Sequence, residues 1–173
     1  PTRRSSDLKV KMEDDHTKVS ISKTDITDGK EIEGAKLQIL DQDGEVVESW
    51  TTGEEHLIEY LPIGTYTLHE EAAVDGYIVA NDVEFTVEET GEIQKVKMED
   101  ERAMGQLVIV KTDTDSKTAL EGVEFVLLEK ETGEEVGRLK TGKDGKAVSE
   151  LLPIGTYENG VFKEPITYVL KET

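Results

Sequence analysis

The chain has no cysteine, few aromatic residues and no long apolar run. Without cysteine it can form neither a disulfide nor a thiolate metal site. No apolar run approaches the length needed to cross a membrane, and no signal peptide opens the sequence. The sequence therefore predicts no thiol chemistry and no membrane insertion by these 173 residues.

Positive charge is also scarce. Lys and Arg total 20 against 39 Asp and Glu, which gives a formal net charge of -19. Such a chain repels nucleic acid phosphates and anionic lipid, so neither is an expected partner. The three histidines share no ligand spacing, and no glycine-rich loop suggests phosphate binding. We expect no metal and no cofactor.

The clearest feature of the sequence is its internal repeats. The segment Ile21–Asp25 recurs as Ile109–Asp113, and Leu61–Tyr66 returns identically as Leu152–Tyr157. Residues 9–15 are also similar in sequence to residues 95–101. Repeats of this length indicate an array of similar modules.

The repeats divide the chain into four parts. Residues 1–8 fit no pattern and resemble a translated sequencing-adapter oligonucleotide, so we expect them to be non-native. Residues 9–15 read as the last strand of a preceding module, residues 16–102 as a complete module, and residues 103–173 as the N-terminal part of a second one. The pattern in the final residues breaks off within a strand, which predicts a truncated second module.

Each module is predicted to be β throughout. Short β-rich runs are separated by turn signals such as Asp43-Gly44 and Thr132-Gly133, and no stretch has a helical period. This spacing is typical of an all-β fold of tandem antiparallel β-sandwiches. In the complete module the expected strands are 19–23, 36–40, 46–51, 57–60, 65–70, 83–87 and 93–100.

Two lysines fall on the inward face of predicted strands. Side chains alternate along a strand, so Lys23 shares a face with Val19 and Ile21. By the same rule Lys111 shares a face with Leu107 and Ile109. A buried ammonium group is costly unless something pairs or reacts with it.

Two carboxylates follow the same rule in the first module. Glu70 shares a face with Tyr66 and Leu68, and Asp100 shares a face with Val96 and Met98. Three strands therefore direct Lys23, Glu70 and Asp100 to one interior.

Burial suggests a reaction among these groups, because it favours the neutral amine and the neutral carboxylic acid. Lys23 could attack the Asp100 carboxyl while Glu70 shuttles the proton, giving an amide bond without a cofactor. The bond would close a loop of roughly 78 residues and constrain the unfolded chain by about 4–5 kcal/mol. Two alternatives remain open: a buried Lys–Asp–Glu salt-bridge cluster, and strand-end charges that reach water.

Three segments together carry a resemblance to a known family. They are Ser22-Lys23-Thr24-Asp25, the Leu61–Tyr66 turn, and Glu70 ahead of Ala72–Tyr77. The chain resembles the collagen-adhesin B-type (Cna-B) domain, the SpaA-like module of Gram-positive surface adhesins and pilins, over residues 9–173.

The resemblance implies a prealbumin-like, reverse-Ig-like sandwich with an intramolecular isopeptide bond. In that family an inward lysine joins an Asn or Asp on the last strand with help from a Glu, which places these roles on Lys23, Asp100 and Glu70. An aspartate acceptor implies loss of water, whereas an asparagine acceptor would release ammonia.

The neighbouring modules carry incomplete sets of the lysine, glutamate and acceptor residues. Lys111 and Glu172 occupy the lysine and glutamate positions of the second module, whose acceptor is not in the sequence. Asp14 is the orphan acceptor of a preceding module. Residues 158–166 enlarge the second module as a loop without an assigned role.

These observations favour a structural stalk of a cell-wall-associated surface protein or pilin, outside a Gram-positive cell. Its only reaction would be a single self-cross-linking event, so it would not be an enzyme. Its partners would be neighbouring modules of the same chain. The alternatives are an adhesin module that binds a host extracellular matrix protein, and a transthyretin-like accessory domain of an extracellular enzyme.

Overall fold

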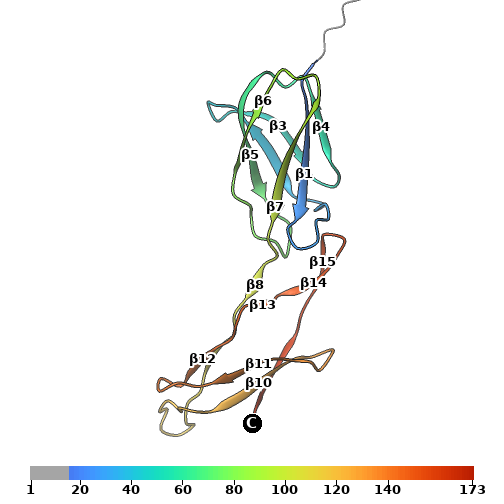
Figure 1. Cartoon of the computed structure of the whole chain (residues 1–173). Coiled ribbons are helices and arrows are strands. Elements are labelled where there is room, and N and C mark those ends of the chain that lie inside the picture. The colour runs from blue at the N-terminus through green and yellow to red at the C-terminus, as the bar shows by residue number, and fades with distance from the viewer. Residues whose placement is uncertain (1–15) are drawn as a thin grey trace, which may run out of the picture.

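The computed structural model describes residues 16–173, and these form two β modules placed end to end (Figure 1). None of the described residues lies in a helix, so this part of the chain has no helix that could cross a membrane. The predictions for residues 1–8, for residues 9–15 and for Asp14 fall outside the described residues.

The first module is a sandwich of two sheets. One sheet has the order β4-β1-β7 and the other has the order β3-β2-β5-β6. The all-β fold class is confirmed, and the strands lie within one or two residues of the expected ones. Their bounds are β1 Lys18–Asp25, β2 Lys36–Leu40, β3 Val46–Thr51, β4 His56–Glu59, β5 Gly64–Ala72, β6 Val83–Val87 and β7 Ile93–Asp100.

The core of this module lies between its sheets. Alternate residues of β1, β2, β5 and β7 point inward, as the period of two requires. The outward lysines Lys95 and Lys97 of β7 are exposed. The buried apolar residues of the core are Val19, Ile21, Leu37, Ile39, Ile58, Leu61, Tyr66, Leu68, Val87 and Met98.

One pairing differs from the antiparallel expectation. β1 and β7 are parallel, with Lys23 opposite Met98 and Asp25 opposite Asp100. They are the first and last strands of the module, so the chain between them is long enough to return to the starting end. As a result, both strands finish at the same end of the module, beside the linker to the next one (Figure 1).

The second module repeats part of this plan. It contains a sheet of order β11-β10-β16 and the pair β12-β9, and β8 pairs with β13 near the linker. Its strands are β8 Met104–Gly105, β9 Val108–Val110, β10 Glu124–Glu129, β11 Glu135–Lys140, β12 Lys146–Val148, β13 Leu152–Pro153, β14 Gly155–Glu158, β15 Val161–Pro165 and β16 Tyr168–Glu172. Within residues 16–173, β9 has one neighbouring strand where β1 has two.

Residues 158–166 are not the loop expected from the sequence. They form most of a hairpin, β14–β15, that projects toward the first module (Figure 1). Asn159 and Gly160 make its two-residue turn with φ of 52° and 74°. Positive φ at both positions is the type I′ geometry that Asn-Gly favours in tight hairpins.

Because of the hairpin, the repeated Leu-Pro-Ile-Gly-Thr-Tyr motif is not structurally equivalent in the two modules. In the first module the Tyr66 hydroxyl donates to the Pro62 carbonyl at 2.9 Å. In the second module it is Tyr168 that donates to the corresponding Pro153 carbonyl, at 2.8 Å. Tyr157, which matches Tyr66 in sequence, lies in the hairpin instead.

Candidate functional site

Three ionisable side chains meet inside the first module. Lys23 of β1 is 1% exposed, Glu70 of β5 is 2% exposed and Asp100 of β7 is 0% exposed. Each follows apolar residues on the inward face of its strand, so the alternation that builds the core also brings in the charges. β1 and β7 belong to one sheet and β5 to the other, so the cluster spans the sandwich.

Lys23 contacts both carboxyl groups. Its Nζ donates to Oδ1 of Asp100 and lies 3.1 Å from Oε1 of Glu70. The other Glu70 oxygen, Oε2, accepts the backbone N–H of Ala80 at 2.6 Å, which fixes the orientation of the carboxyl group. Asp100 Oδ2 is buried without a hydrogen-bond partner in the described part of the chain, and Glu70 Oε1 has its ion-pair contact with Lys23. Asp100 Oδ2 is therefore the carboxyl oxygen of the cluster that remains available to a proton.

The charges of the cluster do not balance. One ammonium and two carboxylates give a net charge of -1 in a nearly water-free site, and one added proton makes the set neutral. Burial raises the pKa of Asp100 to about 6; Lys23 opposes this rise and Glu70 reinforces it. The raised pKa of Asp100 favours the neutral acid form of this side chain.

This arrangement can support amide formation. A protonated Asp100 is an electrophile whose hydroxyl group can leave as water, and the lysine nitrogen already touches that carboxyl group. Glu70 is close enough to Nζ to accept its proton. Among residues 16–173, no group of three or more acidic or histidine side chains could hold a metal ion.

The second module carries a partial copy. Lys111 Nζ lies 2.6 Å from Oε2 of Glu172. Glu172 of β16 is paired with Phe125 of β10, just as Glu70 of β5 is paired with Leu37 of β2. The pair of Lys111 and Glu172 is exposed, with side-chain fractions of 32% and 50%. In the described residues no strand stands beside β9 where β7 stands beside β1, so the pair has no acceptor carboxyl group.

The sequence interpretation missed a second buried cluster. Asp25 is 0% exposed and bonds to Arg102 and Tyr77 at the end of the first module. The alternation rule contains the signal, because Asp25 has the same parity as Val19 and Lys23. Arg102 and Tyr77 lie outside the strands, where that rule does not apply.

Comparison with known proteins places this geometry in a family. Residues 17–102 and residues 105–173 each match the SpaA prealbumin-like fold domain. The chain belongs to this family. A search of the curated proteins finds no match to the sequence.

Solved structures share the SpaA fold. The Bacillus anthracis TIE protein is 32% identical with a TM-score of 0.55, over 88% of this chain and 31% of that protein. A variant of BcpA, the major pilin subunit of Bacillus cereus, is 16% identical with a TM-score of 0.50, over 77% of this chain and 52% of BcpA. This chain thus spans about a third of the first relative and half of the second. The resemblance drawn from the sequence is confirmed at the level of family and fold.

Proposed function

We propose that the chain is a structural stalk segment whose first module locks itself with an amide bond between Lys23 and Asp100. The observation that carries this proposal is the contact of Lys23 Nζ with the Asp100 carboxyl group, beside Glu70, in a site no more than 2% exposed. A salt bridge alone would bury three ionisable groups with an unbalanced charge, which is a poor source of stability.

The reaction balances within the three side chains. The Glu70 carboxylate accepts a proton from the Lys23 ammonium, and the neutral amine attacks Cγ of the protonated Asp100. The C–N bond forms, and the C–OH bond breaks as Glu70 gives its proton to the leaving hydroxyl, which departs as water. Glu70 then takes the second proton from the attacking nitrogen, so the amide is neutral and Glu70 ends as the neutral acid. No oxidant, nucleotide or metal is required, and the first module reacts once.

The proposed bond lies on the route that a pulling force would take. β1 begins near the point where the chain enters the module, and β7 ends where the chain leaves it toward the second module (Figure 1). A bond from Lys23 to Asp100 passes tension directly from one strand to the other. Residues 24–99 would then carry none of it and could not be drawn out.

This mechanical property suits a protein exposed outside the cell. BcpA is described as a major pilin subunit, and we extend that setting to this chain: the surface of a Gram-positive cell, with other pilin subunits and neighbouring modules as partners. Because the bond is an amide, reducing agents would not open it.

Single-molecule force spectroscopy of the chain tests the proposal. With the bond, the first module should release almost no contour length before the attachment breaks. In Glu70→Gln, which removes the proton acceptor, unfolding of this module should release on the order of 250–300 Å, the span of its unlocked chain. A wild-type protein that releases the same length as Glu70→Gln would overturn the proposal.

A further inference from the structure

The junction between the modules contains a second polar cluster that the amide-bond proposal does not use. Its centre is Asp25, at the end of β1. The Asp25 carboxylate accepts the Thr27 N–H at 2.8 Å and Arg102 Nε at 2.7 Å. Burial raises the pKa of Asp25, but the bonds from Thr27, Arg102 and Tyr77 outweigh it and leave the pKa lowered. Asp25 is therefore a fixed anion at the base of the first module.

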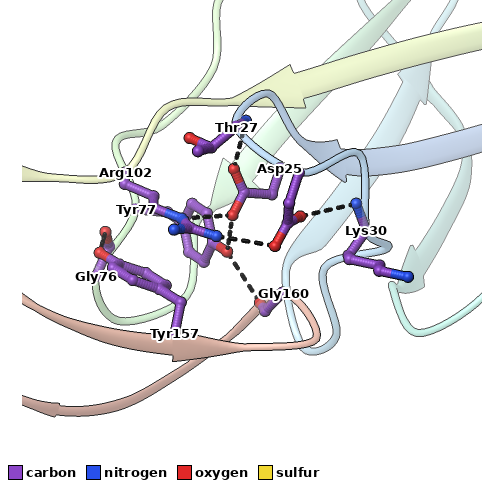
Figure 2. Close-up of polar contacts among 9 residues, drawn as sticks. Asp25, Thr27, Lys30, Gly76, Tyr77, Arg102, Tyr157 and Gly160 are labelled. Atoms are coloured by element: carbon purple, nitrogen blue, oxygen red, sulfur yellow. Dashed lines mark hydrogen bonds and ion pairs between the residues drawn. The ribbon is translucent and has the colours of Figure 1, made fainter.

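The tip of the β14–β15 hairpin meets this cluster (Figure 2). The Tyr77 hydroxyl lies 2.9 Å from Oδ2 of Asp25 and 3.1 Å from the carbonyl oxygen of Gly160 at the hairpin turn. In return, the Tyr157 hydroxyl of β14 donates to the carbonyl oxygen of Gly76. Polar contacts thus run in both directions between the modules.

Aromatic and cationic groups fill the space between these hydrogen bonds. The guanidinium carbon of Arg102 lies 4.4 Å from the centre of the Tyr157 ring, a favourable cation–π arrangement. Tyr77 meets the same ring edge-on, with 5.3 Å between the ring centres. Arg102 therefore joins the Asp25 anion of the first module to an aromatic residue of the second.

Two glycines show how closely the surfaces fit. A Cβ on Gly160 would lie 2.3 Å from the Glu31 carbonyl oxygen, and one on Gly76 would lie 2.4 Å from the Phe162 ring. Both positions also have positive φ, which glycine adopts without strain. The hairpin tip rests on the loop after β1, whose Ile32 N–H bonds to the Lys23 carbonyl at 2.8 Å.

We propose that the base of the first module is a docking site for this hairpin, and that the hairpin acts as a clamp that fixes the angle and rotation between the modules. The docking site consists of Asp25, Gly76, Tyr77 and Arg102. The linker between β7 and β8 is a single covalent connection whose backbone is hydrogen-bonded to Gly76 and Ile78 of the first module, and the hairpin supplies a second connection beside it. The two modules then move as one rigid piece.

Spin-label distance measurement on the whole chain tests the clamp. The chain has no cysteine, so Glu45→Cys in the first module and Lys143→Cys in the second provide two exposed labels without background. Pulsed electron paramagnetic resonance should give one narrow distance distribution. A broad distribution in this otherwise wild-type chain would overturn the proposal.

Paired variants make the test specific. Gly160→Ala introduces the clash with Glu31 and should at least double the width of the distribution. Gly133→Ala is the matched control, because Gly133 also sits in a hairpin turn with φ of 70° but has nothing within 4 Å of its Cβ position. This control should leave the width unchanged.

A deletion covers the case in which Gly160→Ala deforms the hairpin itself. Removing residues 156–166 joins Gly155 to Thr167-Tyr168 and recreates the Leu-Pro-Ile-Gly-Thr-Tyr sequence of the first module. The second module should keep its fold and lose the clamp, again with at least a doubled width. A narrow, wild-type distribution after deletion would refute the clamp. None of these readouts depends on whether Lys23 and Asp100 are bonded.

Discussion

The substitution Glu70→Gln tests the role of the buried cluster through stability. Glutamine has nearly the size and shape of glutamate and can still accept the Ala80 N–H through its carbonyl oxygen. It cannot take a proton from Lys23, so the amide bond should not form. Lys23 keeps its contact with Asp100, which limits the direct electrostatic cost of the change.

The size of the expected loss of stability follows from the entropy of loop closure. A bond between Lys23 and Asp100 closes a loop of roughly 78 residues, and the chain-entropy relation developed for disulfides gives about 4.5 kcal/mol. For a domain of this size each kcal/mol shifts the melting temperature by about 4–8 °C. We therefore expect the first module of Glu70→Gln to melt about 20–35 °C below that of the wild type.

Differential scanning calorimetry of the whole chain measures this shift, with the second module as an internal reference. Glu71→Gln is the matched control: it is the same chemical change at the next residue, on the exposed face of β5. Its melting temperature should stay within a few degrees of the wild type. Equal melting temperatures for Glu70→Gln and Glu71→Gln would refute the reasoning.

Two further predictions concern the acceptor and the second module. In protein refolded from a denatured state, bond formation should become slower as the pH is raised from 5 to 8. The reason is that Asp100, with a pKa of about 6, is the reactive neutral acid below that pH and a carboxylate above it. The rate, followed by intact mass, should fall by roughly 10–100-fold, and a rate that rises with pH would contradict this role. Tyr168→Phe should destabilise the second module by about 1 kcal/mol, because it removes the hydrogen bond to the Pro153 carbonyl. Tyr157→Phe should leave the stability of that module nearly unchanged. Denaturant unfolding of the second module measures both effects, and equal effects would contradict the structural equivalence of Tyr168 with Tyr66.

Much of the first module could be predicted from the period of its strands. Alternation alone directs Lys23, Glu70 and Asp100 inward, and the structure brings them into contact. The parallel pairing of β1 and β7 could not be predicted this way, because parallel and antiparallel strands have the same period of two. Only the course of the chain around the sandwich decides it.

The second module shows where repetition misleads. The motif Leu152–Tyr157 is identical to Leu61–Tyr66, yet its tyrosine lies in the hairpin and Tyr168 takes the equivalent position. Asn159-Gly160 was the available signal for a hairpin, since few other pairs tolerate positive φ at both turn positions. The docking of that hairpin depends on contacts between residues as far as 83 positions apart, which no local pattern contains.

The intact mass of the purified wild-type chain tests the central claim most directly. Amide formation between Lys23 and Asp100 removes one water, so the account predicts a mass about 18 Da below that calculated from the sequence. Proteolysis should then yield one branched peptide containing both residues. A chain with its full calculated mass would show that the buried groups form only an ion pair, and the covalent lock would have to be abandoned.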